Sequence, residues 1–70
     1  MKEYLDFLFT DEETGEDFFV ELSYNSETQP NAIQDLYPKA QEIAKENFEK
    51  PKFLGVYGKE DAEILGLDTY

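Results

Sequence analysis

The 70-residue chain contains no cysteine, no histidine and no arginine. Without cysteine it has no disulfides, no thiolate metal ligand and no thiol nucleophile. Without histidine it lacks the side chain that most often serves as a general base near neutral pH and as a metal ligand. Without arginine it lacks the bidentate donor that binds phosphates and guanine edges. These absences exclude most catalytic triads, zinc sites and nucleic-acid-binding surfaces.

Positive charge is scarce as well. Six lysines stand against 17 acidic residues, and the net charge is −11. The imbalance is local, because residues 1–29 hold nine of the acids and one lysine, whereas residues 30–52 hold four of each. Charge of one sign on one element either forms a solvated surface or complements a cationic partner. Direct nucleic-acid binding is not expected, because such a chain repels the phosphate backbone.

Long apolar runs are also missing. No segment approaches the ~20 apolar residues of a membrane-spanning helix, and residues 1–6 carry acids where a signal peptide needs an apolar stretch. A cytoplasmic protein without membrane contact is therefore expected. The length predicts a single domain, residues 1–70, near the lower limit for a fold without disulfides or metal. With 40% hydrophobic and 16% aromatic residues, it has the apolar surface that disordered acidic tails lack.

Two segments alternate between apolar and polar residues, which predicts two strands with one apolar face each. They span residues 4–10 and 18–24, and the acidic connection between them contains Gly15, which can adopt a positive φ. A hairpin closed by the turn Glu12–Gly15 is the simplest link. This register brings the apolar side chains together as the pairs Phe9–Phe18, Phe7–Val20 and Leu5–Leu22.

Helical spacing follows the hairpin, because apolar residues between 33 and 48 recur three and four positions apart. Pro38 interrupts this pattern. A proline inside a helix loses a hydrogen bond and clashes with the preceding turn, at a cost of about 3 kcal/mol. We therefore predict a short turn at residues 31–36 and a main helix from Tyr37 to about Lys50, with Pro38 in its first turn.

The C-terminal third predicts one more strand and one more helix. Residues 53–57 are rich in β-forming side chains, and Gly55 marks a bulge or a close backbone approach. Residues 59–65 then form a short helix, which Gly66 ends and on which Leu67 packs back. The fold class is α+β, in the order hairpin, helix, strand and short C-terminal helix (ββαβα). We expect a three-stranded sheet with the main helix on one face. A right-handed crossover through the helix would make the third strand parallel to the second. If the third strand lies beside the first instead, the order is 2-1-3 with antiparallel neighbours, and we prefer this order.

No motif with catalytic or metal-binding spacing is present. The acidic residues 11–17 lack the alternation, the central glycine and the distal glutamate of an EF-hand loop, and a solvated turn is the simpler interpretation. The serines and threonines have no histidine base, and the glycines form no phosphate-binding loop. The sequence therefore predicts a protein that is not an enzyme and that has no cofactor and no metal site.

One face of the predicted hairpin mixes apolar and acidic side chains. Its register places Leu8 opposite Phe19 and Asp6 opposite Glu21. An apolar pair among acids is typical of a partner-binding patch, although a third strand or the C-terminus could cover the same pair and make it core. The candidate partner-binding residues are Tyr4, Asp6, Leu8, Phe19 and Glu21, with the turn acids Glu12, Glu13, Glu16 and Asp17.

Two hypotheses about function follow. The first is a small acidic interaction module that binds a basic surface of a partner protein, in its sharpest form a DNA mimic or phage-type inhibitor. The alternative is a small homo-oligomeric accessory or structural protein, such as a homodimer that buries Leu8, Phe19 and Tyr4 in a symmetric contact. The composition suits a bacterial or phage accessory protein under either hypothesis.

Overall fold

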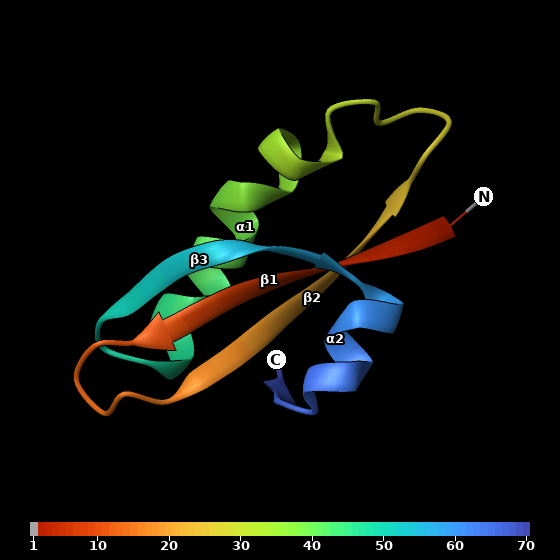
Figure 1. The fold of residues 1–70 in the computed structure, drawn as a ribbon. Coiled ribbons are helices and arrows are strands. Elements are labelled where there is room, and N and C mark those ends of the chain that lie inside the picture. Colours follow the sequence, from red (N-terminus) through yellow and green to blue (C-terminus); the bar gives the residue numbers. More distant parts are fainter. Residues whose placement is uncertain (1) are drawn as a thin grey trace.

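The computed structural model describes residues 2–70 and confirms the α+β class (Figure 1). Along the chain lie β1 (Lys2–Asp11), β2 (Asp17–Asn25), α1 (Ala32–Asn47), β3 (Pro51–Gly58), α2 (Lys59–Leu65) and β4 (Asp68–Thr69). Within these residues the strands form one four-stranded sheet in the order β3-β1-β2-β4. The predicted order of the first three strands is confirmed. The predicted three-stranded sheet is corrected, because β4 pairs parallel to β2 at Phe18 and Phe19.

The β1–β2 hairpin has the predicted antiparallel register, with the facing pairs Phe9–Phe18, Phe7–Val20 and Leu5–Leu22. In its turn Gly15 adopts a φ of 76°, and the Gly15 N–H donates to the Asp11 carbonyl at 2.7 Å. The Asp11 side chain is buried and accepts hydrogen bonds from the backbone N–H groups of Glu13 and Lys50 and from the Thr14 hydroxyl. Asp11 therefore fixes the turn and joins it to the start of β3.

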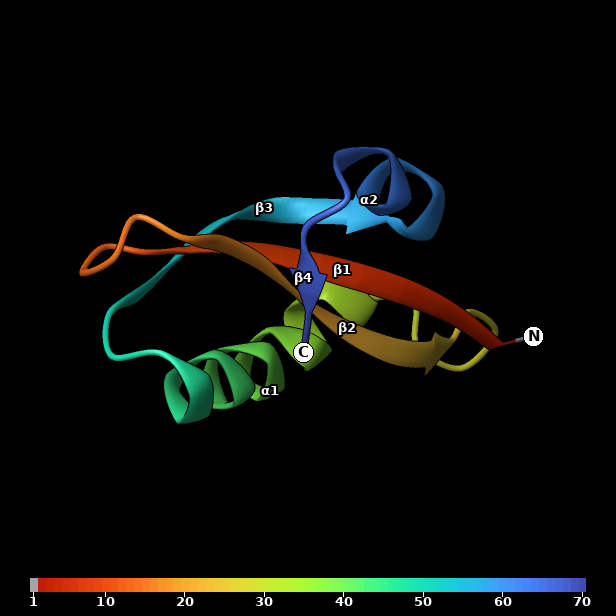
Figure 2. The same ribbon diagram turned by 90° about the horizontal axis from the view of Figure 1, so that it is seen from below.

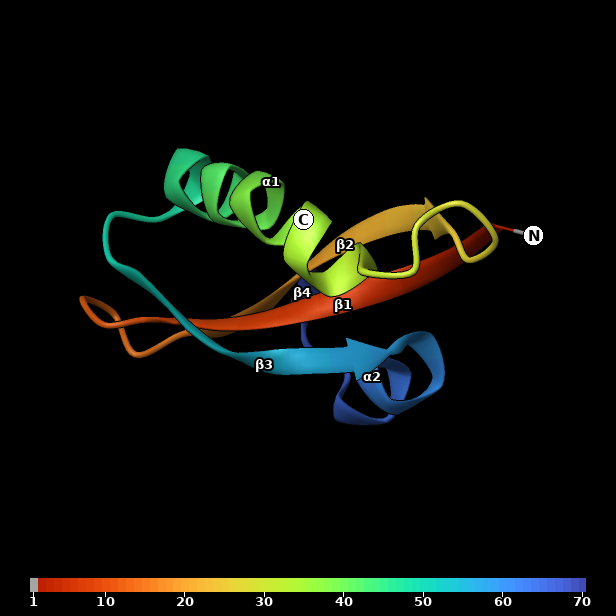
Figure 3. The same cartoon turned by 90° about the horizontal axis from the view of Figure 1, so that it is seen from above.

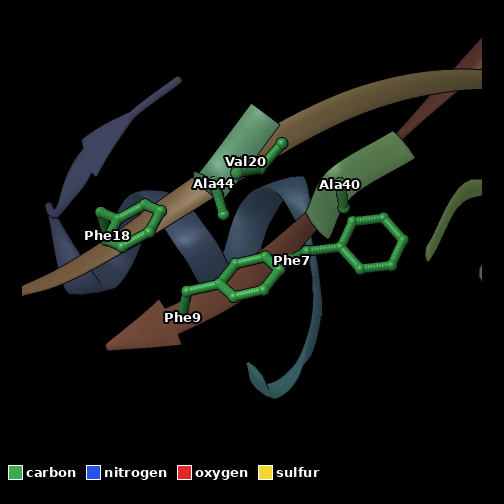
Figure 4. Close-up of a cluster of buried hydrophobic side chains, with 6 residues drawn as sticks. All are labelled: Phe7, Phe9, Phe18, Val20, Ala40 and Ala44. Carbon is green, nitrogen blue, oxygen red and sulfur yellow. The ribbon is translucent and has the colours of Figure 1, made fainter. Parts of the chain in front are cut away.

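Helix α1 lies on one face of the sheet and forms the main core with the hairpin (Figure 2). Ala40 and Ala44 of α1 are fully buried against the phenylalanine rings of β1 and β2 (Figure 4). Their small side chains let the helix approach the sheet closely. The rings of Phe18 and Phe48 stack with their centroids 4.0 Å apart. Such aromatic pairs contribute about 0.5–1.5 kcal/mol beyond the burial of their area.

Helix α1 runs through Pro38 without a break, so the predicted split at this residue is wrong. Proline at this position costs the hydrogen bond to the Gln34 carbonyl. The turn that precedes it nevertheless stays helical, because Ala32 is buried and Leu36 and Tyr37 pack against the main core. Burial of these apolar side chains, at about 25 cal/mol per Å², offsets the lost hydrogen bond.

The helix α1 ends at Asn47, earlier than the predicted Lys50, because Phe48 adopts an extended conformation and packs against the main core. Strand β3 then pairs antiparallel with β1, and the register shifts between the pairs Leu8–Gly55 and Phe9–Phe53. This irregularity lies where the sequence predicts a bulge at Gly55. It keeps Phe53 on the main-core face, where its ring meets that of Tyr37 at a centroid distance of 5.0 Å.

Helix α2 lies on the face of the sheet opposite α1 (Figures 2 and 3). There it covers a second core, which consists of Leu8, Phe19 and Ala62 with Tyr57 and Leu67 packed against them. Gly66 adopts a φ of 64° and ends α2 as predicted, so that Leu67 returns to the sheet. The prediction that a helix covers one face of the sheet is therefore corrected, because α1 covers one face and α2 covers the other.

Candidate functional site

The predicted apolar patch around Leu8 and Phe19 does not lie on the surface. These side chains are 9% and 1% exposed, because α2 and Leu67, the second residue after its end, cover them. Burial of Leu8 and of Phe19 stabilises the fold by roughly 1.5–3 kcal/mol for each side chain, which explains why the short helix docks here. Leu8 and Phe19 are therefore core residues, and their assignment to a partner-binding surface is wrong.

The acidic residues that flank this second core do line an open site. A cleft of about 290 Å³ lies between α2 and the hairpin, with Asp6 and Glu21 on the sheet side and Lys59 and Glu63 on the helix side. We call it the acidic cleft. Asp6 and Glu21 are facing residues of β1 and β2. Lys59 and Glu63 are four positions apart on α2, so they share one side of the helix.

Asp6 is the most unusual group of the acidic cleft. It is only 1% exposed, and its buried Oδ2 accepts no hydrogen bond from an N–H or O–H donor among the described residues. The Glu21 carboxyl lies within hydrogen-bonding reach. Two carboxyl groups can form such a bond only when one of them carries a proton, because an ionised carboxylate only accepts. At neutral pH the pair is therefore short of donors.

The electrostatics of the acidic cleft raise the pKa of Asp6 from 3.8 to about 6. Burial is the largest cause, because it removes water from the charged form. The negative charge of Glu21 and the hydrogen bond with its carboxyl come next, and Glu63 adds a smaller repulsion. Lys59 acts in the opposite direction. A buried carboxyl with a strongly shifted pKa in a cleft is typical of functional sites, although structural networks produce such shifts too.

Lys59 is the one cationic side chain among the described residues that line the acidic cleft. Its ammonium nitrogen lies 4.8 Å from the centroid of the Tyr4 ring, within the range of a cation–π contact. Tyr4 is 39% exposed and belongs to the rim of this side of the sheet. Because Lys59 is directed toward Tyr4 and three carboxyl groups line the cleft, the cleft keeps an excess of negative charge.

The structure separates the other predicted site residues from the acidic cleft. Glu12, Glu13, Glu16 and Asp17 are exposed at the closed end of the hairpin, beyond the part of the sheet that α2 covers (Figure 1). Sequence reasoning thus brought Asp6 and Glu21 together correctly, but it missed Lys59 and Glu63. The spacing of these two on one side of a predicted helix was visible. Nothing in the sequence indicated on which face of the sheet that helix would dock.

Comparison of the chain with protein-family models, with curated proteins and with solved structures finds no match. Neither helix within residues 2–70 is long and apolar enough to cross a membrane. No group of three acidic side chains in the described part of the chain could hold a metal ion. The acidic cleft is thus distinguished by a buried carboxyl whose Oδ2 has no donor among the described residues and by its surplus of negative charge.

Proposed function

We propose that the protein is a non-enzymatic interaction module that binds a basic surface of a partner protein through its α2 side. The α2 side is the sheet face that carries α2, together with that helix. Its acids are Asp6, Asp17 and Glu21 of the hairpin and Glu60, Asp61 and Glu63 of α2, and α2 also carries Lys59. On the other side, α1 carries three acids and two lysines, so it is nearly neutral.

Strand alternation explains this division of charge. Successive side chains of a strand point to opposite faces. Phe7 and Phe9 of β1 and Phe18 and Val20 of β2 face α1 and form the main core, whereas Asp6 and Glu21 face α2. Asp6 and Glu21 of the hairpin and the acids of α2 therefore reinforce one another on a single side of the molecule. A one-sided field of this kind accelerates encounter with a positively charged partner and fixes its orientation.

The observation that carries the proposal is the Asp6–Glu21 pair. Two facing carboxyl groups under a helix, one of them buried without a donor, destabilise the fold. A local feature that costs stability without structural compensation is expected at functional positions. A cationic partner group would supply the missing donors.

The sharper form of the proposal is a DNA mimic or phage-type inhibitor, in which carboxylates occupy the nucleic-acid site of a cytoplasmic protein. The interaction module is favoured over the homo-oligomer alternative, because Leu8 and Phe19, two of the three side chains proposed for the symmetric contact, are buried within the single chain. Two copies that each carry a net charge of −11 also repel one another.

The test compares two triple variants that remove the same number of charges. One neutralises α2 by the substitutions Glu60→Gln, Asp61→Asn and Glu63→Gln. The other neutralises α1 by Asp35→Asn, Glu42→Gln and Glu46→Gln. Each immobilised variant is used to capture proteins from a bacterial lysate at low and high salt, with and without added double-stranded DNA.

We expect a basic protein to be captured at low salt by the unmodified protein and by the α1 variant, and to be lost with the α2 variant. Release by double-stranded DNA supports the DNA-mimic form, because both ligands then compete for one site. Equal capture by the two triple variants contradicts the proposal, since it indicates attraction to net charge without a defined surface.

A further inference from the structure

We propose that the acidic cleft is a receptor for a single guanidinium group, an arginine side chain of the partner that inserts between α2 and the hairpin. This inference rests on the proposed function for the source of the arginine. The site itself consists of residues of this chain: Asp6 and Glu21 on the floor, Glu63 on the helix wall and Lys59 at the rim.

The buried carboxylate supplies the main argument. Asp6 lines the cleft, is 1% exposed and has an oxygen with no donor among the described residues. An ionised carboxylate in such a place is costly unless a cation with N–H donors reaches it. The cleft volume of about 290 Å³ leaves space for a ligand group beside it. The aliphatic part of an arginine would lie along Ala62 and Leu67, which line the same cleft.

The arrangement of the carboxyl groups favours a guanidinium over a metal ion. Calcium and magnesium need oxygen ligands at about 2.0–2.6 Å from one centre. No three acidic side chains in residues 2–70 converge in this way. A guanidinium spreads five N–H donors over a planar fork, so it can serve carboxylates that lie on two walls. It is also more weakly hydrated than an ammonium, which favours it in a partly buried site.

Lys59 tunes the site. Its ammonium lies over the Tyr4 ring at the rim of the cleft. Because it is positively charged, it attracts the cleft carboxylates and repels an incoming cation. Removal of this charge is expected to strengthen binding. Protonation has the opposite effect, because a neutral Asp6 no longer attracts the ligand. The groups that face Asp6 are Glu21 on β2, Tyr57 on β3, and Lys59 and Glu63 on α2.

The experiment titrates the ¹⁵N-labelled full chain with N-acetyl-arginine amide at pH 7 and low salt, and follows the backbone amides by NMR. N-acetyl-citrulline amide, a neutral compound of similar shape, and N-acetyl-lysine amide are the matched ligands. Asp6→Asn, Glu21→Gln and Lys59→Gln are tested beside the unmodified chain. Glu63→Gln changes only an exposed helix residue and keeps the test valid if a sheet variant fails to fold.

We expect saturable shifts at residues 6, 21 and 59–67 with the arginine compound, weaker binding of the lysine compound and none of the citrulline compound. Affinity should fall at least about tenfold in Asp6→Asn and in Glu21→Gln, fall less in Glu63→Gln and rise in Lys59→Gln. It should also fall at pH 5. Equal binding of citrulline, shifts centred on residues 12–17, or no saturation would overturn the inference.

These outcomes are separable from those of the lysate test. In one outcome the α2 variant loses capture of a basic protein while the cleft of the unmodified chain does not bind the arginine compound. That pair of results supports the interaction module and contradicts the guanidinium receptor. Saturable arginine binding without any captured partner supports the receptor and contradicts the proposed function.

Discussion

Replacement of Asp6 by asparagine is expected to stabilise the protein at neutral pH. Asparagine has nearly the shape of aspartate, carries no charge, and offers N–H donors to Glu21. The pKa of Asp6 rises from 3.8 to about 6 in the folded state, and each unit corresponds to about 1.4 kcal/mol. Ionisation of this buried group therefore costs the folded state about 3 kcal/mol relative to the unfolded chain.

The pH dependence has a defined sign. Because the folded state has the higher pKa, it binds more protons than the unfolded chain between the two pKa values. The loss of folding stability that ionised Asp6 causes has its full value at pH 7 and above. It decreases as the pH falls through 6 and is absent below about 3.8. The unmodified protein should therefore gain about 1 kcal/mol of stability between pH 7 and pH 5 from this group.

The assay is urea unfolding followed by circular dichroism, at pH 7 and at pH 5, on the unmodified chain and on Asp6→Asn and Glu13→Gln. Glu13→Gln is the matched control, because it removes one charge from an exposed turn residue. At pH 7 we expect Asp6→Asn to gain about 2–3 kcal/mol, which raises the thermal midpoint by about 10 °C or more. The control should change by less than about 0.5 kcal/mol.

A double variant, Asp6→Asn with Glu21→Gln, adds a second check. Its gain should be little larger than that of Asp6→Asn, because either change removes the same repulsion. A destabilising Asp6 is contradicted if Asp6→Asn is no more stable than Glu13→Gln at pH 7, or if the unmodified protein is equally stable at both pH values. Either result would mean that Asp6 is well solvated or paired in solution.

Substitutions at three further positions test the fold. Pro38→Ala should stabilise the protein by about 1–2 kcal/mol, measured by urea unfolding, since the restored bond to the Gln34 carbonyl and the relieved steric clash outweigh the entropy that the unfolded chain regains; a loss would contradict the continuous helix. Asp11→Ala should destabilise by about 2–3 kcal/mol, because it leaves the N–H groups of the turn and of Lys50 without their acceptor, and Asp11→Asn should recover part of this loss. Phe19→Ala should destabilise by about 3–5 kcal/mol and reduce the far-ultraviolet circular dichroism at 25 °C; an unchanged unfolding midpoint would show that the second core contributes little.

Local sequence pattern was sufficient for the hairpin and the end of α2. The alternation of residues 4–10 and 18–24 allows one register, because a slip by one residue turns every apolar side chain to the wrong face. Gly66 ended α2 as predicted, since glycine adopts the left-handed conformation at no steric cost. These features depend on neighbours in sequence or on facing strands, and both are readable from spacing.

Tertiary packing decided the rest. Pro38 stays inside α1 because burial of Leu36 and Tyr37 outweighs a local penalty that the sequence shows by itself. Leu8 and Phe19 look the same in sequence whether they face solvent or a helix, and only the docking of α2 makes them core. The same docking buries Asp6 beside Glu21 and places Lys59 and Glu63 of α2 next to them in the acidic cleft. The amino-acid sequence thus set the charge and the pairing of β1 with β2, whereas the long-range placement of one seven-residue helix created the acidic cleft.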